Sequence, residues 1–227
     1  MHDLAKTFII AQAIGGDTPA PTPTVTKGLV FSEYDSNGYP HKVEFVGSWT
    51  SIPTRFLCGQ TNADSVYNKY ITELVIPEGV TSIGGYAFAY MRALTSVTLP
   101  STLAAIAFGG GREFQYCSGL TSITIPSGVK QISNETFYSC TALKTVYFLG
   151  NITKINGSFR GNTETELYDF SHNTSIPTLS NVASLGHKSG CVIKIPSALS
   201  DTTLGTGNGW ESKTNWAALT DVVWEVV

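Results

Sequence analysis

Apolar residues recur at a fixed spacing in the middle of the chain. From about residue 70 to residue 160 the pattern L-x-x-L-x-I-P-x-x-V-x-x-I-x-x-x-x-F-x-x-C repeats, with spacings of 23, 26 and 23 residues. The repeat is marked by Pro77, Pro100, Pro126 and, in the equivalent place, Leu149. The three extra residues fall in the segment AFGGGRE, between Ile106 and Phe114. A period of roughly 20 to 29 residues is typical of a solenoid, whose turns stack their apolar residues on one another.

Equivalent apolar positions align as four columns. They are Leu74, Val97, Ile123 and Val146; Ile76, Leu99, Ile125 and Phe148; Ile83, Ile106, Ile132 and Ile155; and Phe88, Phe114, Phe137 and Phe159. The alternation in x-L-x-I-P predicts a short strand with its apolar residues pointing inward, ended by a proline that has no N–H to donate. We expect these strands to run parallel in one sheet and the rest of each turn to be coil or short helix.

Weaker turns and two caps are predicted on either side of the clear repeats. Downstream, Leu167 is expected to point inward from a strand, and residues 191–196 form another strand. The tail is rich in tryptophan and ends in the strand-like segment 222–227. Because a solenoid exposes apolar surface at both ends, it needs caps. The expected division is an N-terminal cap with a degenerate repeat at 27–69, repeats at 70–196 and a Trp-rich C-terminal cap at 197–227.

The N-terminal segment differs from the rest of the chain. Residues 1–16 place Leu4, Phe8 and Ile9 at roughly helical spacing, and the Pro/Thr-rich residues 17–26 predict an extended linker. A helix this short is marginal alone in water, so we interpret it as a docking or oligomerisation helix. A signal peptide is the competing interpretation, disfavoured by a single basic residue and a short apolar run.

The repeat resembles the BspA-like, or TpLRR-type, leucine-rich repeat. The match is strong over about residues 70 to 160 and looser on both sides. The resemblance implies a leucine-rich-repeat solenoid without catalytic residues, often surface-exposed, whose characterised members bind host proteins or cells. Several segments, among them YDSNGYPHKVEFVGSWTSIP, are similar to predicted proteins of gut Firmicutes and their prophages.

Composition excludes several function classes. The chain has 227 residues, a formal net charge of -3 and 14% charged residues. Without an excess of basic residues, nucleic-acid binding is not expected. No apolar run reaches the roughly 20 residues of a membrane span. Four cysteines are too few for a disulfide scaffold.

The candidate chemical groups favour structural roles, so no catalytic residue, metal site or cofactor is predicted. Cys117 and Cys140 share a repeat position with Met91, as expected of an apolar ladder rather than a metal site. Asp169, Ser171 and His172 lie too close in sequence to arrange as a triad, which favours a turn.

Two surfaces remain as binding candidates. Arg112, after three glycines, is expected on a protruding loop that contacts a partner. The second candidate is the outward strand face, where Thr and Tyr suit adaptable hydrogen bonding and stacking. Its predicted residues, aromatic toward the C-terminal end, are Glu73, Val75, Thr98, Thr124, Thr145, Tyr147, Glu166 and Tyr168.

These features predict a non-enzymatic recognition or adhesion module. It would bind a host protein or glycan through the strand face while displayed on a phage particle or a bacterial surface. Residues 1–16 would attach it to the virion or surface scaffold, and a homo-oligomer is possible through the same helix. The alternative is a structural virion component, such as a decoration or tail-fibre subunit, without a ligand.

Overall fold

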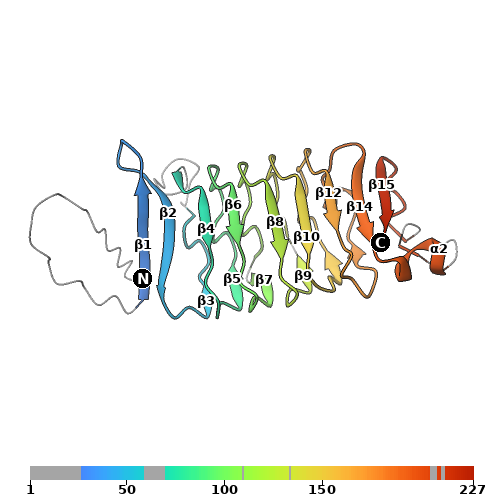
Figure 1. Cartoon of the computed structure of the whole chain (residues 1–227), viewed down its shortest axis with the longest axis horizontal. Helices are drawn as coiled ribbons and strands as arrows, with labels where there is room; N and C mark the ends of the chain where they lie inside the picture. The colour runs from blue at the N-terminus through green and yellow to red at the C-terminus, as the bar shows by residue number, and fades with distance from the viewer. Residues whose placement is uncertain (1–26, 59–69, 109, 133, 205–208, 211–212) are drawn as a thin grey trace, which may run out of the picture.

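The computed structural model describes residues 27–58, 70–108, 110–132, 134–204, 209–210 and 213–227. The expected docking helix, with Leu4, Phe8 and Ile9, and the expected linker at 17–26 lie outside the described residues. The described part is an elongated stack of turns with short strands along its length (Figure 1). This confirms the predicted leucine-rich-repeat solenoid of parallel strands.

The first row of strands forms two sheets along one side of the stack. The sheet nearer the N-terminus contains β1 (Lys27–Tyr34), β2 (Pro40–Gly47), β4 (Glu73–Val75) and β6 (Ser96–Thr98). The next contains β8 (Ser122–Ile125), β10 (Thr145–Phe148), β12 (Leu167–Asp169), β14 (Cys191–Ile195) and β15 (Val222–Val226). Among the described strands of this row, β1 and β2 pair antiparallel and the other pairs are parallel.

A second row of strands occupies the half-turn that the sequence predicted as coil or helix. Its members are β3 (Ser51–Ile52), β5 (Ser82–Gly84), β7 (Ala105–Phe108), β9 (Gln131–Ile132), β11 (Lys154–Ile155) and β13 (Thr178–Leu179). Most are only two or three residues long, which is too short to leave a visible alternation in the sequence. The described helical segments are η1 (Val182–Ser184), η2 (Ser197–Leu199) and α2 (Asp201–Leu204).

The core is a set of ladders parallel to the long axis of the stack. The phenylalanine column is the clearest: the ring centroids of Phe88, Phe114, Phe137 and Phe159 are 5.3, 5.4 and 5.4 Å apart in succession. All four side chains are fully buried. Stacked aromatic pairs at this separation contribute beyond their buried area, by about 0.5–1.5 kcal/mol per pair.

Threonine hydroxyls at the corners connect successive turns. Thr72, Thr95 and Thr121 occupy equivalent corners, and each donates its Oγ1 proton to a main-chain carbonyl of the preceding turn, at 3.3, 3.0 and 3.3 Å. Thr153 and Thr165 do the same at 3.0 and 2.8 Å. Most of these carbonyls also accept a backbone N–H from the following turn, so the threonine hydroxyls add a second hydrogen bond between turns at the same corners.

Aromatic residues cover the C-terminal end of the core. Trp210 and Trp216 are buried and lie over Phe170, with ring centroids 5.1 and 5.6 Å from it. The indole N–H of Trp216 donates to the carbonyl of Pro177 at 2.9 Å. At the other end, the β1–β2 hairpin lies beside the first parallel strand (Figure 1).

Both rows of strands are interrupted at the same level of the stack. The first row breaks between β6 and β8, and the second between β7 and β9. The turn between these strands is the one lengthened by three residues. The interruption opens part of the strand face, as described next.

Candidate functional site

The outward strand face carries most of the residues predicted for it. Glu73, Val75, Thr98, Thr124 and Tyr147 are exposed on their strands. Thr145 is half-buried in β10. Glu166 is exposed but lies just before β12, where its carboxylate is 3.9 Å from the Nζ of Lys144 and 3.8 Å from that of Lys188.

Tyr168 is not on this face, which corrects the prediction. In the parallel pairing of β10 with β12, Tyr168 aligns with the inward residue Val146, and Leu167 aligns with Thr145. Tyr168 is fully buried, and its hydroxyl donates to the carbonyl of Gly186 at 2.7 Å. The register differs by one residue from the predicted one, and such a slip moves every side chain of a strand to the other face.

The row of the strand face that continues from Tyr147 is therefore charged rather than aromatic at its C-terminal end. Asp169 takes the place next to Tyr147, and Lys194 and Glu225 follow it on β14 and β15. The Nζ of Lys194 lies 2.9 Å from the Oε1 of Glu225. The row mixes both signs of charge and contains one exposed tyrosine. The neighbouring outward row, which continues from Thr145 as Leu167, Val192 and Val223, is apolar.

A groove of about 350 Å³ opens on the strand face where the sheet is interrupted. Val97 and Leu99, which belong to the inward columns, are partly exposed in it. The predicted residues Thr98 and Thr124 line it from the two sides. Leu149 lies at its margin with 47% of its surface exposed. The groove thus combines apolar side chains with threonine hydroxyls.

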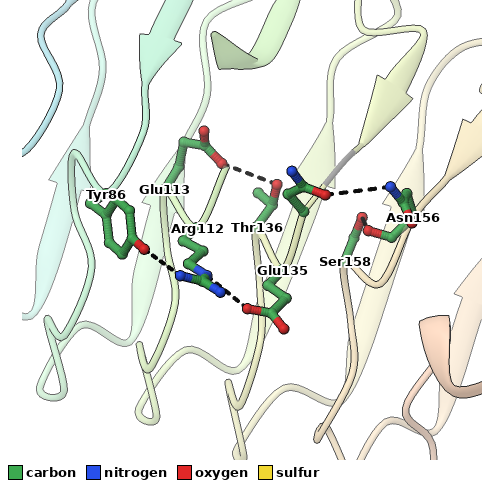
Figure 2. Close-up of polar contacts among 8 residues, drawn as sticks. Tyr86, Arg112, Glu113, Glu135, Thr136, Asn156 and Ser158 are labelled. Atoms are coloured by element: carbon green, nitrogen blue, oxygen red, sulfur yellow. Dashed lines mark hydrogen bonds and ion pairs between the residues drawn. The ribbon is translucent and has the colours of Figure 1, made fainter. Parts of the chain in front are cut away.

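Arg112 lies on the other side of the turn, in a set of contacts that the sequence did not reveal (Figure 2). Its Nε is 2.7 Å from the Oε2 of Glu135, and its Nη1 donates to the hydroxyl of Tyr86. The hydrogen bonds that the guanidinium donates to Tyr86 and to Glu135 raise the pKa of Arg112. The guanidinium is thus fixed between two neighbouring turns rather than carried on a free loop.

The backbone explains why glycines precede this arginine. Gly111 has φ +79°, and a Cβ there would lie 2.3 Å from the carbonyl oxygen of Asn134. Only glycine permits that approach of two turns. Arg112 itself has φ 67°, and Tyr86 and Glu135, at the same place in the turns on either side, have φ 58° and 60°.

Arg112 and Glu135 belong to the wall of a larger groove of about 840 Å³. The groove is rich in side-chain amides and guanidinium groups. Its lining is Gly110, Arg112, Asn134, Glu135, Asn156, Gly157, Arg160, Asn181, Ala183 and Asn215. Asn134 and Asn156 stand out in the sequence as two N-x-S/T triplets at matching places of the repeat, and that signal alone could have suggested the groove.

Buried polar groups below this groove do not face it. Glu113 follows Arg112 but points into the stack, where its Oε2 accepts a hydrogen bond from Thr136 at 3.1 Å (Figure 2). Its other oxygen is buried without a partner, and burial raises the pKa of the carboxyl to about 7. Cys117 and Cys140 are buried and donate to carbonyls of the preceding turn at 3.3 and 3.2 Å.

The remaining chemical candidates are structural in the described part of the chain. The carboxylate of Asp169 accepts the backbone N–H of Ser171 at 2.9 Å and so closes a turn. Ser171 Oγ and His172 Nδ1 are 3.2 Å apart on the exposed side of this turn. Among the described residues, no group of three His, Cys, Asp or Glu side chains gathers as metal ligands. No described helix has the length and apolar character needed to cross a membrane.

Comparison with known proteins agrees with this architecture. The model for a BspA-type leucine-rich repeat region matches residues 60–184 with six copies. No curated protein matches the chain. A solved leucine-rich cell surface protein of Faecalibacterium prausnitzii A2-165 aligns with 70% of this chain and 61% of its own, at 19% identity and a TM-score of 0.24. The chain therefore spans less than two thirds of that protein.

Repeats of this type usually serve as non-enzymatic binding modules. The matched region contains the clear repeats, the interrupted strand face and the residues around Arg112. The chain belongs to the family of proteins that contain a BspA-type leucine-rich repeat region.

Proposed function

We propose that the protein is a recognition module that binds a protein partner through its strand face, in the region of the groove between β6 and β8. The supporting observation is the groove itself, where inward-column residues become partly exposed between two threonine-bearing strands. The family match supports protein binding as the general role. A setting outside the cell, on a bacterial surface, is part of the proposal and rests on the family resemblance alone.

The composition of the strand face fits a protein surface better than a small ligand. Three exposed apolar side chains, Val75, Tyr147 and Leu149, are 42, 37 and 47% exposed around the groove. Threonine hydroxyls between them can donate and accept hydrogen bonds. Shallow surfaces with a few apolar anchors and a polar rim are typical of protein interfaces, whereas small molecules prefer enclosed pockets.

The proposal is tested by displaying the full chain against an array of purified host extracellular-matrix and epithelial surface proteins. A partner found there is then titrated with Thr124→Arg, which places a long charged side chain in the groove wall. The matched control is Gln131→Arg, because Gln131 is also an exposed strand residue but lies on the second row. We expect a loss of at least about tenfold in affinity for the first variant only, as for a charge buried at an interface.

Two outcomes would contradict the proposal. Equal affinity of the two variants for the partner would show that the strand face is not part of the binding interface. Failure of the intact chain to bind any array member at micromolar concentration would instead favour a structural component without a ligand, the alternative considered from the sequence.

A further inference from the structure

The groove around Arg112 has the chemistry of a ligand site that is separate from the strand face. It extends over several turns, from Gly110 to Asn215, and its wall contains four asparagines, two arginines and one glutamate. Figure 2 shows Arg112 lying between Tyr86 and Glu135, with Asn156 on a neighbouring turn. None of these groups is required to close the core, because the core columns lie inward of them.

The asparagines present hydrogen-bonding groups in a row. The Nδ2 of Asn156 donates to the Oδ1 of Asn134 at 3.4 Å, which orients the two amides along the stack. Asn134 is exposed and Asn156 is half-buried, so both retain groups that a ligand can reach. A primary amide offers two donors and one acceptor oxygen, the combination needed to pair with neighbouring hydroxyl groups.

The two arginines of the groove differ in their pairing. Arg112 is neutralised locally by Glu135, at 2.7 Å. Arg160 is exposed, and the structure gives its guanidinium no hydrogen bond, ion pair or ring contact among the described residues. Counted over its described lining residues, the groove therefore holds one uncompensated positive charge, although the whole chain is negatively charged. An unpaired guanidinium in a polar groove favours a carboxylate or sulfate group.

A row of tyrosines runs along the same turns. The ring centroids of Tyr90 and Tyr116 are 5.0 Å apart, and those of Tyr116 and Tyr138 are 5.4 Å apart. All three side chains are half-buried, so part of each remains accessible. These tyrosines do not line the groove, but Tyr138 follows the lining residue Glu135 by three positions in the same turn. Amphipathic rings of this kind combine an apolar contact surface with a polar hydroxyl.

We propose that this groove binds an acidic oligosaccharide, with Arg160 contacting a carboxylate or sulfate group and the asparagine amides contacting sugar hydroxyls. A nucleic acid is a poor fit because a single unpaired cation cannot neutralise a run of phosphates. An apolar small molecule is a poor fit because the lining is mostly amide and charged. The site is independent of the strand face, so either proposal can fail without the other.

The test measures binding of three sugar hexamers to the full chain by calorimetry. Hyaluronan hexamer carries carboxylates only, chondroitin sulfate hexamer carries carboxylates and sulfates, and chitin hexamer is neutral. We expect at least one acidic hexamer to bind about tenfold or more tightly than the neutral one, as for a charge-assisted contact. Comparison of the two acidic probes distinguishes carboxylate from sulfate recognition.

Variants locate the site. Arg160→Ala is expected to lower the affinity for the acidic hexamer by about tenfold and to leave any affinity for the chitin hexamer unchanged. Asn156→Ala is expected to weaken every hexamer that binds. Arg92→Ala is the control, because Arg92 is also an exposed arginine but lies outside the groove. Circular dichroism verifies that each variant is folded.

Three results would overturn the proposal. One is the absence of binding of all hexamers at millimolar concentration. Another is an equal loss for Arg160→Ala and Arg92→Ala, which would indicate attraction by overall charge. The third is tighter binding of a neutral extended peptide, used as a competitor, than of every sugar. That result would mean that the asparagine amides recognise a peptide main chain.

Discussion

At the scale of single residues, Glu113 is the most unusual side chain of the described structure. It is fully buried, one carboxylate oxygen has no partner, and the other accepts a hydrogen bond from the hydroxyl of Thr136. The same position holds Ala87 in the preceding turn and Thr136 and Ser158 in the following ones, all uncharged. A single ionisable group in this column makes stability depend on pH.

We predict that stability falls as pH rises from about 4.5 to about 7. Burial raises the pKa of Glu113 from its ordinary value of 4.5 to about 7, so in this window the folded state binds more protons than the unfolded state. By linkage, the free energy of unfolding then decreases with pH, by about 3 kcal/mol over the window. Below the window both states are protonated, and above it both are ionised.

The comparison of the wild type with Glu113→Gln checks this prediction. The urea midpoint of the variant should stay nearly constant between pH 5 and pH 7.5, because the amide does not titrate. A parallel decline of both proteins would assign the pH dependence to other groups.

Two tyrosines test the corrected strand register. Tyr168→Ala is expected to lower the free energy of unfolding by about 3–5 kcal/mol, because it removes a fully buried ring and a hydrogen bond to Gly186. Tyr147→Ala, on the neighbouring strand, is expected to cost less than about 0.5 kcal/mol because that ring is exposed. Equilibrium urea unfolding measures both; similar costs would mean that the register is wrong.

At the scale of the element, each turn depends on two kinds of special backbone position. The turns after the second row of strands contain residues with positive φ, among them Tyr86, Arg112, Glu135 and Gly157. Other glycines are needed because the preceding turn is too close for a Cβ. Gly150 is an example, since a Cβ there would lie 2.5 Å from the carbonyl oxygen of Ser127.

Two substitutions separate these roles. Gly157→Ala is expected to lower the free energy of unfolding by only about 1 kcal/mol, the penalty for an alanine in the left-handed region. The reason is that φ is +64° and nothing lies within 4 Å of the new Cβ. Gly150→Ala is expected to cost more, since two backbones must move apart. Thermal and urea unfolding give the two values, and a smaller loss at Gly150 would show that the turns are less tightly stacked than described.

At the scale of the whole molecule, the chain is a one-dimensional stack. Each strand of the parallel rows pairs only with the strands of adjacent turns. Trp210 and Trp216 are buried at one end, over Phe170. In such an architecture, stability is close to a sum of the turns and the contacts between neighbours, so damage at one end should remain local.

Trp216→Ala is expected to loosen the C-terminal turns selectively. The change removes a buried indole and its hydrogen bond to Pro177, so β12 and β14 should lose amide protection while β4 and β6 keep theirs. Hydrogen exchange followed by mass spectrometry measures each strand. Uniform loss of protection along the chain would contradict the one-dimensional description.

The sequence alone determined the repeat, the inward columns and the phenylalanine stack. A residue type that recurs once in every repeat must occupy the same place in each turn, so the repeat pattern and apolarity suffice to identify the inward positions. The same reasoning predicts Cys117 and Cys140 in the core, and their burial confirms it.

The tertiary structure decided what the period leaves open. Tyr168 lies where the spacing of the repeat changes, and only the pairing of β12 with β10 fixes which face it takes. The second row of strands is too short to have a periodicity. The groove around Arg112 is assembled from side chains of different turns. Their contacts depend on backbone positions with positive φ, among them Arg112 and Glu135. Because these residue types usually have negative φ, the sequence does not indicate such a conformation. Repetition along the chain specifies the stack, whereas register and contacts between turns specify the surfaces.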